Sequence, residues 1–168
     1  MKPGKIVVDS SVIVKWVNRI DEFHLEQADS LLSDLESGKI DIITPEIARY
    51  EVGNSLLKKR LELPLALDSL TTVYNLPITV FPQTQKLAFE TYRMAHEAKT
   101  NGFKKVTYYD AAFAALARQE EAILVTDNPK HQAKISGVRV VPLETYNRSS
   151  EVDEIIGSPA KGGTTHNK

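Results

Sequence analysis

Apolar runs of strand length alternate with longer segments of helical periodicity along most of the chain. The short, mostly apolar runs at residues 5–8, 40–43, 78–81, 122–125 and 138–141 are predicted to be strands. The segments between them are predicted to be helices, at residues 10–17, 25–35, 44–60, 64–74, 83–99 and 107–119. Such alternation favours a parallel sheet covered on both faces. We therefore expect an α/β fold, a three-layer αβα sandwich with a mostly parallel central sheet.

Capping residues indicate several helix boundaries. Asp9 and the two serines after it supply side-chain acceptors for the start of the first helix. Gly38 is expected to end the second helix. Thr44 followed by Pro45 combines an N-cap with proline at the first helical position, so the third helix is expected to begin there.

A chain of 168 residues is long enough for one buried core, and we expect a single domain over residues 1–148. Residues 149–168 are rich in glycine and poor in large apolar side chains, so we expect a disordered C-terminal tail. No apolar run approaches the roughly 20 residues of a membrane span. The first apolar run breaks at Asp9, too early for a secretory signal. A cytoplasmic protein with no membrane association is expected.

The amino-acid composition limits the kinds of metal site and nucleic-acid contact that the chain can form. The chain has no cysteine, which excludes disulfides and thiolate zinc sites, so any metal must be held by oxygen or imidazole. A net charge of −1 lacks the basic excess of a protein that coats a nucleic-acid duplex. Basic residues at 15, 58–60, 104–105 and 130 could still form a local rim for phosphates, with a solvated surface as the alternative. The histidines share no metal-ligand spacing and are assigned no site role.

Four acidic residues lie where strand and helix signals meet: Asp9, Glu51, Asp110 and Asp127. Each has an ordinary structural alternative. Asp9 could cap a helix, Asp110 could complete a capping box with Thr107, Asp127 could form a turn, and Glu51 could face solvent. Taken together, they would form an oxygen-rich pocket at the carboxyl ends of the strands, where open α/β sheets bind ligands.

Grouped carboxylates repel one another unless a cation is present, and oxygen ligands suit hard divalent cations. Two divalent ions about 4 Å apart can activate water and stabilise the leaving oxygen of a phosphodiester. Such chemistry requires several acids and no histidine or cysteine nucleophile.

The segments around these acids resemble the PIN domain family, and most of all the VapC-type toxin ribonucleases of type II toxin–antitoxin systems. The matching segments are Val-Val-Asp-Ser-Ser at 7–11, Glu-Val-Gly-Asn-Ser-Leu at 51–56, Tyr-Tyr-Asp-Ala-Ala at 108–112 and Leu-Val-Thr-Asp-Asn at 124–128. They occur in the family's order, and the resemblance covers residues 5–143.

The resemblance implies a hydrolase, an Mg²⁺- or Mn²⁺-dependent endoribonuclease that cleaves RNA. It also implies a homodimer and a cognate antitoxin protein whose tail enters the acidic groove. Asp9, Glu51 and Asp110 match the family's first three catalytic, metal-binding acids. Ser11 and Asn54 match polar residues that support these acids.

The fourth acid departs from the pattern. Many members place it two residues after the threonine, where this chain has Asn128, while Asp127 stands one residue earlier. Either residue could fill the fourth catalytic and metal-binding position, since an amide oxygen can also ligate a metal. Thr126 would not bind the metal itself but would orient one of the carboxylates that do.

Two other functions were weighed against this one. A phosphoaspartate phosphatase needs a second aspartate two residues after the first, where Ser11 stands, and a receiver domain needs an acidic pair that we do not find. A catalytically weak PIN-like domain that binds RNA or a partner without cutting remains open, because of the displaced fourth acid. Tyr108 and Tyr109 could stack on bases, with inward packing of one of them as the alternative.

Overall fold

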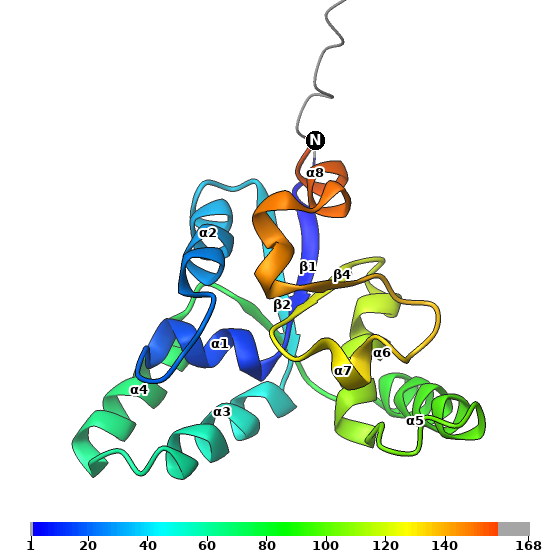
Figure 1. The fold of residues 1–168 in the computed structure, drawn as a ribbon, viewed down its shortest axis with the longest axis horizontal. Coiled ribbons are helices and arrows are strands. Elements are labelled where there is room, and N and C mark those ends of the chain that lie inside the picture. The colour runs from blue at the N-terminus through cyan, green and yellow to red at the C-terminus, as the bar shows by residue number, and fades with distance from the viewer. Residues whose placement is uncertain (1, 158–168) are drawn as a thin grey trace, which may run out of the picture.

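The computed structural model of the protein describes residues 2–157 and has a central parallel sheet flanked by helices (Figure 1). The strands are β1 (Gly4–Val8), β2 (Ile40–Pro45), β3 (Thr79–Phe81), β4 (Ile123–Thr126) and β5 (Val140–Pro142). Their order is β3-β2-β1-β4-β5, and every neighbouring pair is parallel. The predicted three-layer α/β class is confirmed, with a sheet that is fully parallel.

The helices follow the predicted segments closely. They are α1 (Ser10–Val17), α2 (Leu25–Glu36), α3 (Ile47–Lys58), α4 (Leu63–Asn75), α5 (Gln85–Thr100), α6 (Tyr108–Gln119), α7 (Pro129–Gln132) and α8 (Ser150–Ile156), with a 3₁₀ helix η1 (Leu143–Arg148). From β1 the chain steps outwards to β2 and β3, then returns to place β4 and β5 on the other side of β1. Because crossovers between parallel strands are right-handed, this reversal puts α1–α4 and α5–α6 on opposite faces, as Figure 1 shows.

The core is formed where the strands meet α6. Ile6, Val7 and Val8 of β1 are fully buried, and so are most side chains of α6 between residues 111 and 117. The alanines of α6 have small side chains, so the helix can pack closely on β1, β2 and α5. This packing fixes the N-terminus of α6, which carries Asp110, relative to the end of β1.

The predicted start of the third helix is wrong. Pro45 belongs to β2, which pairs with β3, and α3 begins at Ile47. Thr44 is fully buried and donates a hydrogen bond from its hydroxyl to the carbonyl of Val8, 2.8 Å away, instead of capping a helix. Pairing with β3 extends the strand past the position where the local signal predicted a cap.

The expected tail is also corrected in part. Residues 150–156 form α8, with Val152 buried. A side chain at Gly4 would place its Cβ 1.8 Å from Cγ2 of Ile155, so the glycine lets α8 lie against β1. Residues 158–168 lie outside the described residues. Between residues 2 and 157, no helix has both the length and the apolar character that a membrane crossing requires.

Candidate functional site

The strand order reverses at β1, between β2 and β4. Open α/β sheets bind ligands at such a switch point, outside the carboxyl ends of the strands. Asp9 directly follows β1, and Asp127 directly follows β4. The sheet itself therefore brings together two of the four predicted acids from positions more than a hundred residues apart.

Asp9 is held from several directions. Its carboxylate is only 6% exposed and caps α1 by accepting the backbone N–H of Ser11 at 3.1 Å. The hydroxyls of Ser11 and Thr126 donate to its two oxygens, so both residues support this acid as predicted. Burial raises the pKa of Asp9, and these hydrogen bonds oppose the rise in part. The helix-cap alternative and the site prediction describe the same side chain.

Glu51 lies in the second turn of α3, and its carboxylate reaches the start of α1, next to Asp9. Its Oε2 accepts a hydrogen bond from the hydroxyl of Ser10 at 2.8 Å. Burial is the main cause that raises the pKa of Glu51, and the charges of Asp9 and Asp110 raise it further, against the hydrogen bond from Ser10. Asp9, which follows β1, and Asp110 of α6 thus lie close enough to Glu51 of α3 for their charges to act on it.

Asp110 is fixed by the start of α6. It completes the capping box with Thr107, whose backbone N–H and hydroxyl donate to Oδ2 at 2.8 Å and 2.7 Å. The Nδ1 atom of His131 lies 3.6 Å from the same oxygen. Within residues 2–157, Oδ1 makes no hydrogen bond. The capping box therefore positions the carboxylate and leaves one oxygen available to a ligand.

Asp127 takes a different role from that expected. Its Oδ2 lies 2.8 Å from Nζ of Lys15, and its Oδ1 lies 2.6 Å from Nδ1 of His24. Lys15 is only 2% exposed and also pairs with Glu22 at 2.7 Å. Burial lowers the pKa of Lys15, but the hydrogen bonds and charges of Asp127 and Glu22 outweigh this and raise it overall. The carboxylate of Asp127 is thus committed to an ion-pair network, and Lys15 is not part of an exposed basic rim.

The remaining predicted residues, Asn54 and Asn128, have exposed side chains. Asn54 is exposed on α3 and makes no hydrogen bond to an acid among the residues described. Asn128 is also exposed, and its backbone N–H donates to the hydroxyl of Thr126 at 3.0 Å. With Asp127 neutralised by Lys15, Asn128 keeps the freer side chain of the two candidates for the fourth position.

Gln132 and two histidines were missed by the sequence analysis. Gln132 on α7 is 3% exposed and lies beside Asp9, whose pKa it helps to lower, yet its Oε1 has no hydrogen-bond partner among the residues described. His131 and His24 approach Asp110 and Asp127. No local signal marked Gln132 and His131, because α7 is one short turn that follows what reads as an ordinary Asn-Pro turn, and His24 stands alone before α2. His166 lies outside the described residues.

The donor chemistry suits a divalent cation. In the described part of the chain, no group of three or more Asp, Glu, His or Cys side chains already has the arrangement of a finished metal site. The charges of Asp9 and Asp110 nevertheless act on the buried Glu51, and the buried amide oxygen of Gln132, beside Asp9, lacks a hydrogen-bond partner among the described residues. A cation bound to oxygen ligands would relieve both conditions. The side chains present are therefore of the chemical type that binds such an ion.

Positive charge gathers on one side of Asp110. Lys104, Lys105, Lys130 and Lys134 surround a surface hollow of about 360 Å³ together with Phe103 and His131. All four lysines are exposed, and His131 connects the hollow to Asp110. This lysine cluster brings together residues at 104–105 and 130, as the rim prediction required. Lys59, by contrast, pairs with Glu22 at 2.6 Å.

Comparisons with known proteins show the family and the fold of the chain. The PIN domain family model matches residues 6–137. Among curated proteins no relative matches the chain.

Solved structures share the fold at low identity. The VapBC2 structure from Rickettsia felis, bound to a promoter DNA fragment, superposes with a TM-score of 0.65 at 18% identity, over 82% of this chain and 98% of that one. DNA-bound VapBC from Salmonella typhimurium gives 0.62 at 18% identity, over 83% and 98%. VapC20 from Mycobacterium tuberculosis, a toxin that cleaves the sarcin–ricin loop, gives 0.58 at 18% identity, over 80% and 98%.

Proposed function

The chain belongs to the PIN domain family, and on this premise we propose that it is an endoribonuclease that hydrolyses RNA phosphodiester bonds with Mg²⁺ or Mn²⁺. The observation that supports the proposal is that Asp9, Glu51 and Asp110 come together near the switch point, where burial and then the charges of Asp9 and Asp110 raise the pKa of Glu51. A folded protein tolerates such repulsion at low cost when a cation offsets it.

Asp9, Glu51 and Asp110 would hold the metal, with Asn128 and Gln132 as neutral oxygen donors nearby. When bound, the ion would supply Lewis-acid chemistry, which activates water and neutralises charge at the phosphate. The chain's own residues prepare the site. Ser11, Thr126, Ser10 and Thr107 donate hydrogen bonds that fix the three carboxylates before any ligand arrives.

Substrate binding is assigned to the lysine cluster. Its four lysines lie next to Asp110 on an otherwise nearly neutral molecule, so they give the site a local attraction for phosphates. Lysines of this kind position the backbone of a nucleic acid and carry no sequence information. The proposal therefore predicts binding that weakens steeply as the salt concentration rises.

The test is cleavage of assorted RNAs by the purified full chain with Mg²⁺, with Mn²⁺ and with a chelator. Asp9→Asn and Asp110→Asn should each lower metal-dependent cleavage by at least about 100-fold, because removing one preorganised charged group typically costs this much. Asp68→Asn, at an exposed acid on α4, is the matched control and should cleave like the parent. Full activity in Asp9→Asn or Asp110→Asn would contradict the proposal.

We further propose that the protein is the toxin of a toxin–antitoxin pair and forms a homodimer. Two of the similar structures are VapBC proteins bound to DNA. The hairpin of α3 and α4 exposes apolar side chains that a partner would cover, with Leu57 at 77% and Leu63 at 69% exposure. Light scattering of the purified chain tests the dimer, and co-purification with the product of the neighbouring reading frame tests the antitoxin.

A PIN-like domain that binds RNA without cutting it is the second candidate. The observation that favours it is the commitment of Asp127 to Lys15 and His24, which removes one carboxylate from the set. Calorimetry with Mn²⁺ separates the two candidates, since a scaffold without a working site should bind little metal.

A further inference from the structure

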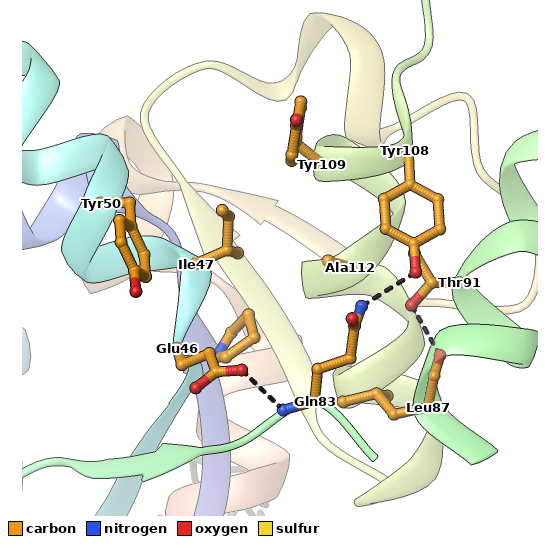
Figure 2. A pocket seen from close by; sticks show the side chains of 10 residues that line it. Glu46, Ile47, Tyr50, Gln83, Leu87, Thr91, Tyr108, Tyr109 and Ala112 are labelled. Atoms are coloured by element: carbon orange, nitrogen blue, oxygen red, sulfur yellow. Dashed lines mark hydrogen bonds between the residues drawn. The ribbon is translucent and has the colours of Figure 1, made fainter. Parts of the chain in front are cut away.

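A second hollow lies between α3, α5 and α6 (Figure 2). Its volume is about 160 Å³. An engineered protein cavity of about 150 Å³ holds a benzene molecule, so this hollow has room for one planar ring. The hollow opens to the surface, and none of the three acids is among its lining residues.

Tyrosine rings dominate its walls. Tyr50 projects from α3 with 74% exposure, and Tyr109 projects from α6 with 55% exposure. Tyr108 lies across the hollow from Tyr50 in Figure 2 and packs edge-on against Tyr109, with ring centroids 6.3 Å apart. Exposed ring faces around a ring-sized space form a platform on which a flat group can stack.

Polar groups at the floor point to a neutral ligand. Gln83 donates from its side-chain amide to the hydroxyl of Tyr108 at 2.9 Å, and from its backbone N–H to Oε1 of Glu46 at 3.0 Å (Figure 2). Its Oε1 makes no hydrogen bond within residues 2–157, so it can accept one from a ligand. Glu46 is the charged group of the lining, and its negative charge disfavours a phosphate.

Two of the tyrosines that line the hollow are direct sequence neighbours of proposed catalytic acids. Tyr50 precedes Glu51 on α3, and Tyr109 precedes Asp110 on α6. The same two helices that bring these acids together therefore carry the aromatic walls. The lysine cluster reaches Asp110 through His131. A nucleotide with its phosphate near Asp110 could thus find lysines for the backbone and the tyrosine hollow for a base.

We infer that this hollow binds one unpaired nucleobase of the RNA substrate, packed against the rings of both Tyr50 and Tyr109 and hydrogen-bonded by Gln83. Unpaired bases in single strands and loops can be turned outwards and stacked on aromatic side chains in this way. The inference rests on the proposed ribonuclease function and adds a binding site for one base of the substrate.

The test measures binding separately from cleavage. The full chain carrying Asp9→Asn, which prevents cleavage, is titrated into a short single-stranded oligoadenylate with one 2-aminopurine, whose fluorescence reports stacking. Tyr109→Ala and Tyr50→Ala should each weaken binding by about 5- to 100-fold, the range for loss of one base–aromatic stack. Tyr92→Ala is the matched control, because Tyr92 is 66% exposed on α5 and does not line the hollow.

A second arm replaces the 2-aminopurine nucleotide with an abasic one and measures the affinity of this oligonucleotide by its competition with the 2-aminopurine oligonucleotide. Loss of the base should weaken binding to the parent by a similar factor and should have little further effect in the Tyr109→Ala variant. Equal affinities of the parent, Tyr109→Ala and Tyr92→Ala for both oligonucleotides would overturn the inference. Conversion of a dimer to a monomer by Tyr50→Ala and Tyr109→Ala, with RNA affinity unchanged, would also overturn it and identify the hollow as a protein interface.

The outcomes distinguish this inference from the proposed function. If the wild-type chain cleaves RNA in a metal-dependent way and the Tyr109→Ala and Gln83→Ala variants cleave it equally well, the base site is contradicted and the nuclease proposal stands. Stacking of 2-aminopurine that depends on Tyr109, in a chain whose wild-type form cleaves no RNA, would support the base site and contradict the nuclease.

Discussion

At the scale of single residues, the ionised carboxylate of Glu51 works against the folded state. Its pKa is raised by burial and by the charges of Asp9 and Asp110. A carboxyl group whose pKa is higher in the folded than in the unfolded chain binds its proton more tightly when folded. Its stabilising contribution is therefore present below the unfolded value, about 4.3 for glutamate, and is lost as the pH rises through the folded value.

We predict that Glu51→Gln unfolds at a higher temperature than the parent at pH 7 in the presence of a chelator. Glutamine keeps an oxygen that can accept the hydrogen bond from Ser10 and removes the repelled charge. The difference should shrink as the pH falls towards 4, where the parent becomes protonated. Thermal unfolding at both pH values measures this, and a less stable Glu51→Gln at pH 7 would contradict the electrostatic account.

Lys15 is the residue on which the Asp127 network depends. Lys15→Met removes the buried cation between Glu22 and Asp127 and leaves these carboxylates with only their second partners, Lys59 and His24. Breaking a buried ion pair costs about 3–5 kcal/mol. These carboxylates are 13% and 18% exposed, so we expect a loss near the lower end, about 3 kcal/mol in the free energy of unfolding.

The control is Lys39→Met, which removes an equally short ion pair to Asp34 from a lysine that is 54% exposed. An exposed pair contributes about 0.2–1 kcal/mol, so this variant should stay close to the parent in urea unfolding. Equal losses in the two variants would show that burial does not set the strength of the Lys15 network.

At the scale of secondary-structure elements, the start of α6 links helix capping to the site. The capping box of Thr107 and Asp110 both begins the helix and fixes the carboxylate. Removing a threonine N-cap costs about 0.5–2 kcal/mol. At this helix the same change should also free Asp110 to rotate away from Glu51 and Asp9.

We predict that Thr107→Ala lowers stability by about 1 kcal/mol and also lowers RNA cleavage. Thr84→Ala is the matched control, because Thr84 caps α5 through the backbone N–H of Leu87 and does not contact the acids. It should lose similar stability in urea unfolding and keep its activity. A similar fall in activity in both variants would assign the effect to stability alone.

At the scale of the whole molecule, metal binding should couple the distant elements that supply the acids. β1, α3 and α6 come from separate parts of the chain, and a ligand that binds them together only in the folded state stabilises that state. At a concentration 100-fold above the Kd, the gain is about 2.7 kcal/mol. For a chain of this size that corresponds to a rise of roughly 5–10 °C in the melting temperature.

We predict such a rise for the wild-type chain in saturating Mn²⁺, measured by calorimetry, and a smaller one for Asp110→Asn. Asp68→Asn should behave like the wild type, since this exposed residue on α4 takes no part in the site. An equal rise in Asp110→Asn would place the ion at other residues.

The sequence alone determined the elements and most of the donor set. Strand and helix periods are local properties, so β1, β4 and α6 could be predicted from runs such as residues 5–8 and from the capping signal at Thr107. The order of short motifs and its resemblance to the family also predicted Asp9, Glu51 and Asp110 as a group, and the structure brings Asp9 and Asp110 near Glu51.

Only the tertiary structure decided which oxygen atoms are free. Thr44 looked like a helix cap, yet its strand extends to pair with β3. Asp127 was expected to be a metal ligand, but its two carboxylate oxygens pair with Lys15 and His24, more than a hundred residues away in the sequence. Gln132 carried no signal at all. Ion pairs and hydrogen bonds between distant segments depend on how the chain returns on itself, and local periodicity contains no information about that path.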